Sequence, residues 1–295
     1  MKQKTRWTLV VLLGAGLSLS CACRNDRDTP EDPEHPWTWN DDNQPAPEED
    51  SFYPKPEGAF RIMSYNVGAL SKFLANSTEM VAAMVREAEA DIVGINELDS
   101  VNARHPVNQV ALLAQSIGGW QWHFGRAMDY RGGAYGNGVV LPADVTVVDR
   151  YTVPLPKGTG SEPRSIAVVE TGRYVLGAAH LDHTSEEAVM GQIETIKAWA
   201  QGKYRNDARP VFFCGDMNSL PTSDAVSALK DSWDLVSATE PTIPVTAPAR
   251  CIDYVFRYKG AAAVKVLGAH TMSRFHNGDV TQASDHLPIY VDVQF

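Results

Sequence analysis

The sequence predicts an α/β domain in which two packed β-sheets carry helices on their outer faces. Many short apolar runs, rich in Val, Ile and aromatic residues, alternate with only a few helical patterns. The strands are too many for one sheet, and the helices are too few for a doubly wound parallel sheet. Residues 59–295 are predicted to form one domain, since folds of this class often reach about 200–250 residues undivided.

Residues 1–23 are typical of a bacterial lipoprotein signal. Lys2, Lys4 and Arg6 precede an apolar stretch that ends in LSLSC and is too short to cross a bilayer as a stable helix. Because such signals are acylated at a cysteine after small residues, we expect Cys21 to carry a lipid anchor. The alternative is an ordinary secretory signal. Both interpretations predict export to the bacterial cell envelope, in a periplasmic or surface-exposed place.

Residues 24–58 are predicted to be a disordered, acidic, proline-rich tether. The segment holds seven prolines and eleven acidic residues and shows no period of 2 or 3.6. It therefore cannot bury enough apolar area to order itself.

The strands of the domain are expected where apolar runs are bounded by turn residues. In chain order the runs cover residues 59–67, 90–98, 120–127, 137–142, 145–151, 164–170, 173–181, 209–216, 251–258, 262–270 and 288–295. Helices are expected where apolar residues recur at helical spacing, over residues 77–90, 106–118, 185–202 and 223–232. The third helix is predicted to open with a capping box from Thr184 to Glu187.

The acidic balance of the chain argues against tight, nonspecific binding to duplex nucleic acid. The sequence has 26 Lys and Arg against 36 Asp and Glu, and residues 59–295 keep an excess of acids. Binding of that kind needs many basic contacts to phosphates. Nucleic acid is therefore a disfavoured partner.

Polar residues end strand after strand of the predicted sheets. They are Asn66, Glu97, His180, Asp216, Asn218, Asp253, Asp285 and His286. Each alone has a simple explanation, such as a turn cap. Together they supply what metal-assisted phosphoester hydrolysis requires: oxygen ligands for Mg²⁺, a base and an amide for the attacking water, and imidazoles for the charge on the phosphorane.

Seven short motifs span the domain between residues 60 and 290. They are SYNVG, INELD, GGAYGNGVVL, AAHLDH, CGDMNS, CIDYVF and SDHLPI. Their order resembles that of the endonuclease/exonuclease/phosphatase superfamily. The resemblance implies a four-layer α/β sandwich, with two mixed sheets packed face to face between helices. It also implies a phosphoric ester hydrolase that uses Mg²⁺, with Mn²⁺ as a substitute.

The resemblance assigns roles to the polar residues position by position. Metal ligands would be Glu97, Asn66 and Asp285. Catalytic residues would be Asp216 and Asn218 on the water, His286 oriented by Asp253, His180 as a second imidazole or general acid, and Tyr135 on the phosphate. Substrate contacts would come from Arg104, Gln109, Asn137 and His183. For Tyr135, Arg104 and His183 a purely structural role is the alternative.

Some positions depart from the family pattern. Val189 stands where small bacterial members often carry an arginine, and Pro142 and Ala143 replace a Ser-Arg-type pair. Gly68 stands where apurinic endonucleases have an acidic residue. The resemblance therefore does not carry over phosphate contacts from the first positions, and a second ligand carboxylate is missing at the last.

Cys214 and Cys251 are expected on neighbouring strands. An oxidising compartment would permit a bridge between them, but direct cross-strand bridges are geometrically demanding. Two buried thiols are therefore the primary expectation.

The predicted function is that of an exported, lipid-anchored, monomeric and Mg²⁺-dependent phosphoesterase. Its substrate would be a small or lipid phosphoester, either a monoester or a diester. A secreted or surface nuclease is the alternative. A surface binding protein that keeps the fold without catalysis is a second alternative, disfavoured because the site residues are complete.

Overall fold

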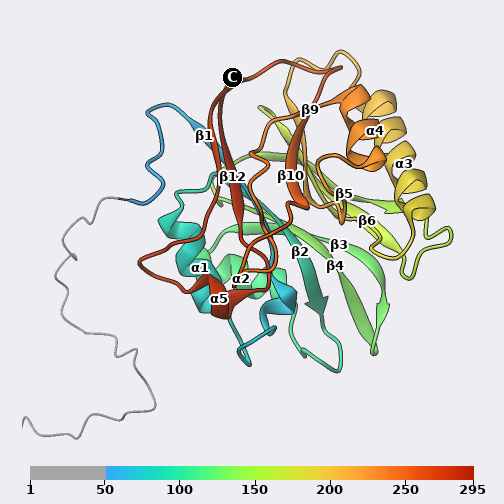
Figure 1. The fold of residues 1–295 in the computed structure, drawn as a ribbon. Coiled ribbons are helices and arrows are strands. Elements are labelled where there is room, and N and C mark those ends of the chain that lie inside the picture. Colours follow the sequence, from blue (N-terminus) through green and yellow to red (C-terminus); the bar gives the residue numbers. More distant parts are fainter. Residues whose placement is uncertain (1–50) are drawn as a thin grey trace, which may run out of the picture. The chain divides into compact units, whose positions relative to one another are not determined.

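Two six-stranded mixed β-sheets pack face to face, and helices cover the outer side of each (Figure 1). The computed structural model describes residues 51–295. Cys21, the predicted signal and most of the predicted tether lie outside the described residues. The arrangement confirms the four-layer α/β sandwich.

The first sheet has the strand order β11-β12-β1-β2-β4-β3. Its strands are β1 (Phe60–Asn66), β2 (Ile92–Ser100), β3 (Gln121–Tyr130), β4 (Gly133–Leu141), β11 (Lys265–Thr271) and β12 (Ile289–Gln294). β1 and β2 are parallel, and their register places Asn66 beside Asn96. The other neighbouring pairs are antiparallel.

The second sheet has the strand order β5-β6-β7-β8-β10-β9. Its strands are β5 (Val147–Leu155), β6 (Arg164–Thr171), β7 (Val175–His180), β8 (Val211–Asp216), β9 (Trp233–Leu235) and β10 (Asp253–Tyr258). β7 and β8 are parallel, and their register sets His180 beside Asp216. The antiparallel register of β8 and β10 sets Asp216 beside Asp253. Three polar residues therefore form one row across the sheet.

Helices lie on the outer side of each sheet (Figure 1). α1 (Thr78–Glu87) and α2 (Gln109–Gly118) pack on the first sheet, and α3 (Glu186–Tyr204) and α4 (Asp224–Ser232) pack on the second. The short helices η1 (Gly68–Leu70) and α5 (Val280–Ala283), like β9, escape prediction because so few residues give no periodic signal. No helix within residues 51–295 is long and apolar enough to cross a membrane.

The start of α3 differs from the prediction. Ser185 is the N-cap, and its hydroxyl oxygen accepts the Ala188 amide N–H at 3.2 Å. The Thr184 hydroxyl instead donates to the Asp182 carboxylate at 2.8 Å. The predicted capping box from Thr184 to Glu187 is therefore wrong, because the Thr184 hydroxyl is hydrogen-bonded to the Asp182 carboxylate instead.

Alternate residues of each strand fill the layer between the sheets. Ile62 of β1 and Phe212 and Cys214 of β8 belong to this layer, whereas the residues between them face the helices. Asn66 and Asp216 share the parity of the inward-facing residues. Their side chains therefore point between the sheets, where the apolar layer ends.

The first described residues are fastened to the domain. The Tyr53 ring lies 5.8 Å from the Tyr290 ring. The buried guanidinium of Arg61 donates to the Tyr53 carbonyl oxygen at 2.8 Å and pairs with Asp292 at 2.7 Å. The predicted disorder therefore does not extend over residues 51–58, because an aromatic ring and backbone carbonyls find partners that composition does not reveal.

Cys214 and Cys251 are both free and buried. Cys214 lies between the sheets, and Cys251 lies in the layer beneath α3 and α4. The primary expectation of two buried thiols is confirmed.

Gly94 sets how closely the two sheets approach. A Cβ at this position would lie 2.2 Å from the Cys214 sulfur. We expect Gly94→Ala to lower the free energy of unfolding by about 1–3 kcal/mol, because overpacking forces the sheets apart. Urea denaturation followed by circular dichroism measures this. The matched control is Gly202→Ala in α3, where a Cβ meets open space, and there unchanged or slightly raised stability is expected. A Gly94→Ala protein as stable as the wild type would contradict the prediction.

Candidate active site

A cavity of about 320 Å³ opens where strands of both sheets end. It is lined by seven of the residues predicted from the sequence, namely Glu97, Tyr135, His180, His183, Asp216, Asn218 and His286. Five further lining residues are Glu162, Arg164, Ile243, Arg250 and Ile252. Residues far apart in the sequence thus meet because the two parallel strand pairs end at the same edge of the sandwich.

The Asp216 carboxylate is the centre of this cavity. Its Oδ1 accepts the Asn218 amide N–H at 2.8 Å, and its Oδ2 accepts the Asn66 side-chain N–H at 3.1 Å. The same Oδ2 lies 3.5 Å from His180 Nε2 and 3.6 Å from His286 Nε2. One buried oxygen therefore faces an amide and two imidazoles.

The pKa of Asp216 is raised. Burial disfavours its charge, and the Asp253 carboxylate in the same row adds repulsion. A carboxyl group whose pKa is shifted toward neutrality is a more effective proton acceptor near pH 7 than an ordinary aspartate.

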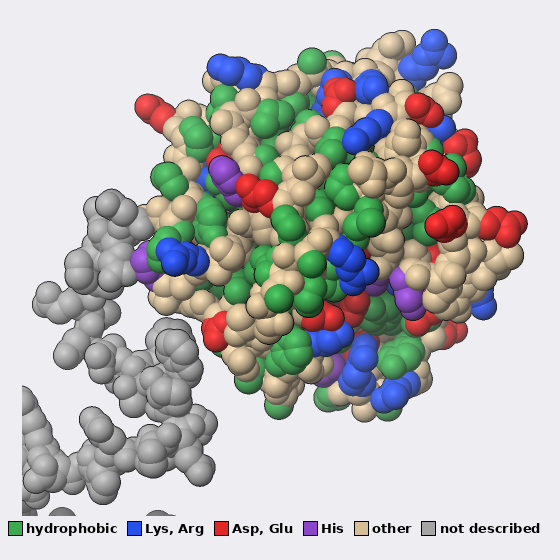
Figure 2. Space-filling view, viewed as in Figure 1, with side chains coloured by type: hydrophobic (Ala, Val, Ile, Leu, Met, Phe, Trp, Pro, Cys, Tyr) green, Lys and Arg blue, Asp and Glu red, His purple; other side chains and the backbone are tan. Residues whose placement is uncertain are grey.

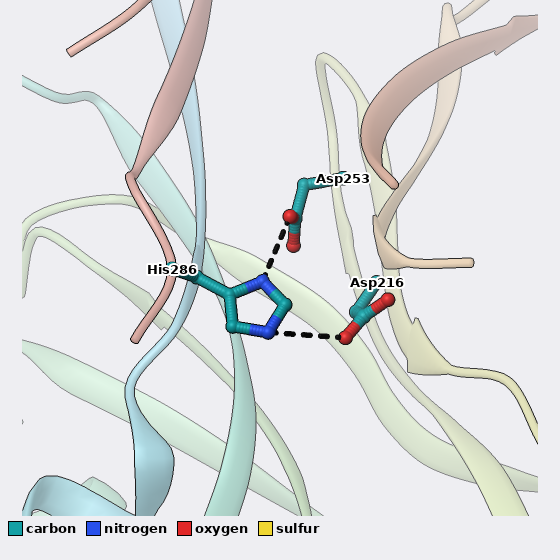
Figure 3. A group of neighbouring side chains, drawn as sticks. All are labelled: Asp216, Asp253 and His286. Carbon is teal, nitrogen blue, oxygen red and sulfur yellow. Dashed lines mark hydrogen bonds and ion pairs between the residues drawn. The ribbon is translucent and has the colours of Figure 1, made fainter. Parts of the chain in front are cut away.

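His286 is held between two carboxylates (Figure 3). Its Nδ1 lies 2.9 Å from Asp253 Oδ2, which also accepts the Thr242 hydroxyl at 2.6 Å. Burial opposes the charge of the ring, but Asp253 and Asp216 outweigh burial and raise the pKa of His286. The two carboxylates therefore favour the charged imidazolium, and Nε2 is turned toward Asp216.

His180 has the opposite electrostatic environment. Burial, and then the nearby Arg164 charge, hold its pKa well below the ordinary value. Asn218 Nδ2 lies 2.9 Å from His180 Nε2 and donates to it. The surroundings of His180 thus favour the neutral imidazole, and its role as a second imidazole or general acid stays a prediction.

Glu97 enters the cavity from a distorted part of β2. The pairing of β2 with β4 shifts between Ile95 and Leu98, and Glu97 has a φ of +60°. Positive φ is uncommon for residues other than glycine and is often found at functional sites. The bulge turns the carboxylate toward the cavity, where its Oε1 accepts the Asn66 side-chain N–H at 3.1 Å.

The cavity offers oxygen donors of the kind that Mg²⁺ prefers. The Glu97 side chain is 26% exposed and, among the described residues, has only Asn66 and the 4.0 Å approach of His180 Nδ1 as partners. His180 Nδ1 is buried without a hydrogen-bond partner in this part of the chain. Asn66 turns its nitrogen toward both carboxylates, so here it is a donor, and its ligand role stays a prediction.

A second group of potential ligands is more deeply buried. Ligand atoms of Asp216, Asp253 and His286 lie within 4.8 Å of one another. The hydrogen bond between His286 and Asp253 already uses Nδ1 and Oδ2. Glu97 is therefore the better candidate for the first metal ligand.

Asp285 does not line the cavity. Its carboxylate pairs with the Lys72 ammonium at 2.8 Å. The expectation that Asp285 ligates the metal stays a prediction, and in this structure its carboxylate has Lys72 as its partner.

Three predicted substrate contacts lie elsewhere for clear physical reasons. The Arg104 guanidinium pairs with Asp99 through Nε–Oδ2 at 2.6 Å and Nη2–Oδ1 at 2.9 Å. Gln109 Oε1 accepts the Asp99 amide N–H at 2.8 Å, and Asn137 Oδ1 accepts the Asn96 side-chain N–H at 3.0 Å. Most polar atoms of these side chains have partners within the domain and none of the three residues lines the cavity, so their roles as substrate contacts stay predictions.

Arg164 is a cavity residue that sequence reasoning missed. It is 3% exposed, its Nη2 lies 3.2 Å from His183 Nδ1, and its Nε has no partner among the described residues. A buried, partly unpaired guanidinium at a cavity wall is suited to bind an anion. The available signal was a basic residue at the start of an otherwise apolar strand.

The fold and the cavity define a protein of the phosphoesterase type. The model of the Endonuclease/Exonuclease/phosphatase family matches residues 63–286, and the chain belongs to this family. No curated protein is significantly similar in sequence.

Solved structures share the fold at low sequence identity. A mannosyl-6-phosphatase of Bacteroides thetaiotaomicron is 18% identical with a TM-score of 0.66, over 80% of this chain and 100% of that one. An endonuclease/exonuclease/phosphatase of Beutenbergia cavernae is 21% identical with a TM-score of 0.63, over 80% and 72%. The human Nocturnin catalytic domain with bound sulfate is 18% identical with a TM-score of 0.61, over 81% and 94%.

The charge of His286 depends on Asp253. We expect Asp253→Asn to lower the pKa of His286 by about 1–3 units, because an opposite charge in contact is replaced by a neutral amide. The measurement is a titration of the histidine ring nitrogens by NMR. His270, an exposed histidine on β11, is the internal reference of the spectrum. An unchanged His286 titration would contradict this account.

Proposed function

We propose that the protein is a divalent-metal-dependent hydrolase that transfers a phosphoryl group from a small or lipid phosphoester to water. One observation carries the proposal. Asp216 Oδ2, an oxygen of raised basicity, faces the imidazolium of His286 and lies in the same cavity as Glu97. A proton acceptor, a cationic donor and a hard oxygen ligand are thereby assembled around one small volume.

A metal ion would be held by Glu97, with Asn66 beside it. Such an ion supplies positive charge that polarises a phosphoryl oxygen. Asp216 Oδ2 accepts the proton of the attacking water. The Asn218 amide N–H donates to Oδ1 of the same carboxylate and so holds it in place. Attack of the water oxygen forms the new P–O bond and breaks the bond to the leaving oxygen, which departs as an alkoxide and takes its proton from solvent. The Asp253 carboxylate keeps His286 charged, so that its Nε2–H donates to a phosphoryl oxygen.

Arg164, whose Nη1 lies 3.6 Å from Glu162 Oε2, adds a second positive charge to the wall of the cavity. Its unpaired Nε and its place in the cavity support a contact with the phosphate in the ground state and in the transition state. Tyr135 lines the same cavity, and burial and the Glu97 charge raise the pKa of its hydroxyl. Tyr135 is therefore a neutral hydrogen-bond donor for the phosphate.

The substrate is proposed to be small. A cavity of about 730 Å³ adjoins the first one through His183 and Asn218, and its wall includes Thr184, Ser185 and Ser223. Hydroxyl groups and the absence of Lys or Arg from this wall, within the described residues, suit an uncharged polar group better than further phosphates. The likeness to a mannosyl-6-phosphatase agrees with a sugar phosphate as one such substrate.

The surface charge of the described residues gives little support to a nuclease function. On the face drawn in Figure 2, acidic and basic side chains of the described residues are interspersed. Duplex binding would need a continuous basic surface. We therefore keep a surface nuclease as the alternative that a substrate panel must exclude.

Activity should depend on an added divalent ion and on Glu97. We expect Glu97→Gln to lower kcat/KM on p-nitrophenyl phosphate or bis-p-nitrophenyl phosphate by about 10²-fold or more, because a neutral amide replaces an anionic ligand. Assays with Mg²⁺, Mn²⁺ and EDTA measure this. Glu194→Gln on the exposed face of α3 is the control, with unchanged turnover. Full activity in excess EDTA would refute the proposal, and so would a fully active Glu97→Gln protein.

We also propose that the protein is exported and held at a membrane by a lipid on Cys21. The support is the LSLSC sequence alone. Cys21→Ser should move the protein from the membrane fraction to the soluble or unprocessed fraction, because acylation is the anchor. Mass spectrometry of the native N-terminus is the measurement. An unmodified N-terminus beyond residue 23 would refute the anchor.

A further inference from the structure

Asn137 lies in β4 opposite the bulge of β2. In the pairing of the two strands, this single residue faces two residues of β2, Asn96 and Glu97. Asn137 has the parity of Val139 and Leu141, which fill the apolar layer between the sheets, and it is 2% exposed. A side-chain amide in such a layer is costly unless its polar atoms find partners.

The side-chain amide of Asn137 has partners in both sheets. Its Oδ1 accepts the Asn96 side-chain N–H at 3.0 Å, within the first sheet. Its Nδ2 donates to the Ser165 carbonyl oxygen at 3.0 Å, and Ser165 belongs to β6 of the second sheet. All three residues are buried, so water does not compete for these hydrogen bonds.

Each of the two hydrogen bonds leads to a residue that lines the cavity. Asn96 Oδ1 accepts the backbone N–H of Asp216 at 3.0 Å. On the other side, Ser165 directly follows Arg164 in β6. Asn137 therefore stands between the backbone that carries the proposed proton acceptor and the backbone that carries the buried guanidinium.

The strands around Asn137 approach one another closely. A Cβ at Gly125, the partner of Asn137 in β3, would lie 2.6 Å from Ala167 Cβ in β6. A Cβ at Gly136 would lie 2.1 Å from the Gly125 carbonyl oxygen. A displacement of the amide is therefore passed on to both sheets. If packing were its only role, an apolar side chain of the same shape would serve without the cost of burying an amide.

We propose that Asn137 is a positioning residue of the active site. Its side-chain amide sets the spacing between Asp216 and Arg164, because it holds Asn96 on one side and the Ser165 carbonyl on the other. The inference rests on the proposed function, in which Asp216 accepts the proton of the water and Arg164 contacts the phosphate. This role is distinct from the substrate contact expected from the sequence, since the amide acts through other residues.

Asn137→Leu in the full-length chain tests the proposal, because leucine has a similar branched shape without the polar atoms. We expect kcat/KM on p-nitrophenyl phosphate or bis-p-nitrophenyl phosphate to fall by about tenfold or more, since misplacement by about 1 Å can cost about 10²-fold. Inorganic phosphate, followed by isothermal titration calorimetry, should bind about fivefold or more weakly, because the hydrogen bonds of Arg164 to the anion lengthen.

Hydrogen exchange at the Asp216 amide is a readout that does not depend on activity. This N–H is bonded to Asn96, which Asn137 holds. NMR should show exchange about tenfold or more faster in Asn137→Leu than in the wild type. The rate is taken relative to the amide of Phe213, a buried residue of the same strand, so that a loss of global stability cancels.

Thr171→Val is the matched control. Thr171 lies at the other end of β6, and its buried hydroxyl donates to the Tyr174 carbonyl oxygen at 2.9 Å. Valine keeps the shape and removes this hydrogen bond. We expect kcat/KM, phosphate affinity and the relative exchange at Asp216 to remain at the wild-type values. Thermal unfolding checks that each variant is folded, and Asn137→Ala, with the same expectations, replaces a leucine variant that does not fold.

The outcomes separate this inference from the proposed function. Wild-type exchange at the Asp216 amide in a folded Asn137→Leu or Asn137→Ala protein would overturn the inference. An equal loss of kcat/KM in Thr171→Val would overturn it as well, because activity would then follow stability alone. A wild type that hydrolyses neither ester would refute the proposed function, and the exchange at Asp216 would still decide whether Asn137 holds that residue.

Discussion

The buried side chain of Asn96 joins the two sheets directly behind the catalytic cavity. Its amide nitrogen donates to the Ala179 carbonyl at 2.8 Å, and its oxygen accepts the Asp216 amide N–H at 3.0 Å. Gly215 permits this approach, since a Cβ there would lie 1.9 Å from the Ala179 oxygen. Each unpaired buried partner would cost roughly 1–3 kcal/mol. The spacing between Asp216 and Asn66, which belong to different sheets, depends on this connection.

Much of the site could be predicted from the alternation of inward-facing and outward-facing side chains along each strand, which is visible in the sequence. Residues two apart face the same side of a strand, so the apolar Ile62 and Phe212 predict that Asn66 and Asp216 face inward. All eleven expected strands form, because each is a long enough apolar run. The family motifs supply what periodicity lacks, namely that these strands end at one edge. Local patterns and the order of the motifs were therefore enough to predict the strands and the inward-facing residues of the site.

The remaining features depend on contacts that no local pattern encodes. The direction of Glu97 comes from a bulge with positive φ, and the pairing of Lys72 with Asp285 joins positions more than two hundred residues apart. Arg164 looks like an ordinary strand start until the cavity beside it is known. Arg104 is the converse case, since the carboxylate that removes it from the site is buried at Asp99. Side-chain competition of this kind is decided only by the folded chain.

The fastening of the N-terminal segment has a mechanical consequence. Arg61 clamps the Tyr53 backbone at the beginning of β1 and, through Asp292, ties that strand to β12. A force that enters at residue 51 therefore reaches β1 through these contacts, and β1 is paired with both β2 and β12. Asn66 lies at the far end of the same strand. A force on the N-terminal segment would thus have to break the contacts of Arg61 and the pairing of β1 before it could change the geometry of the cavity.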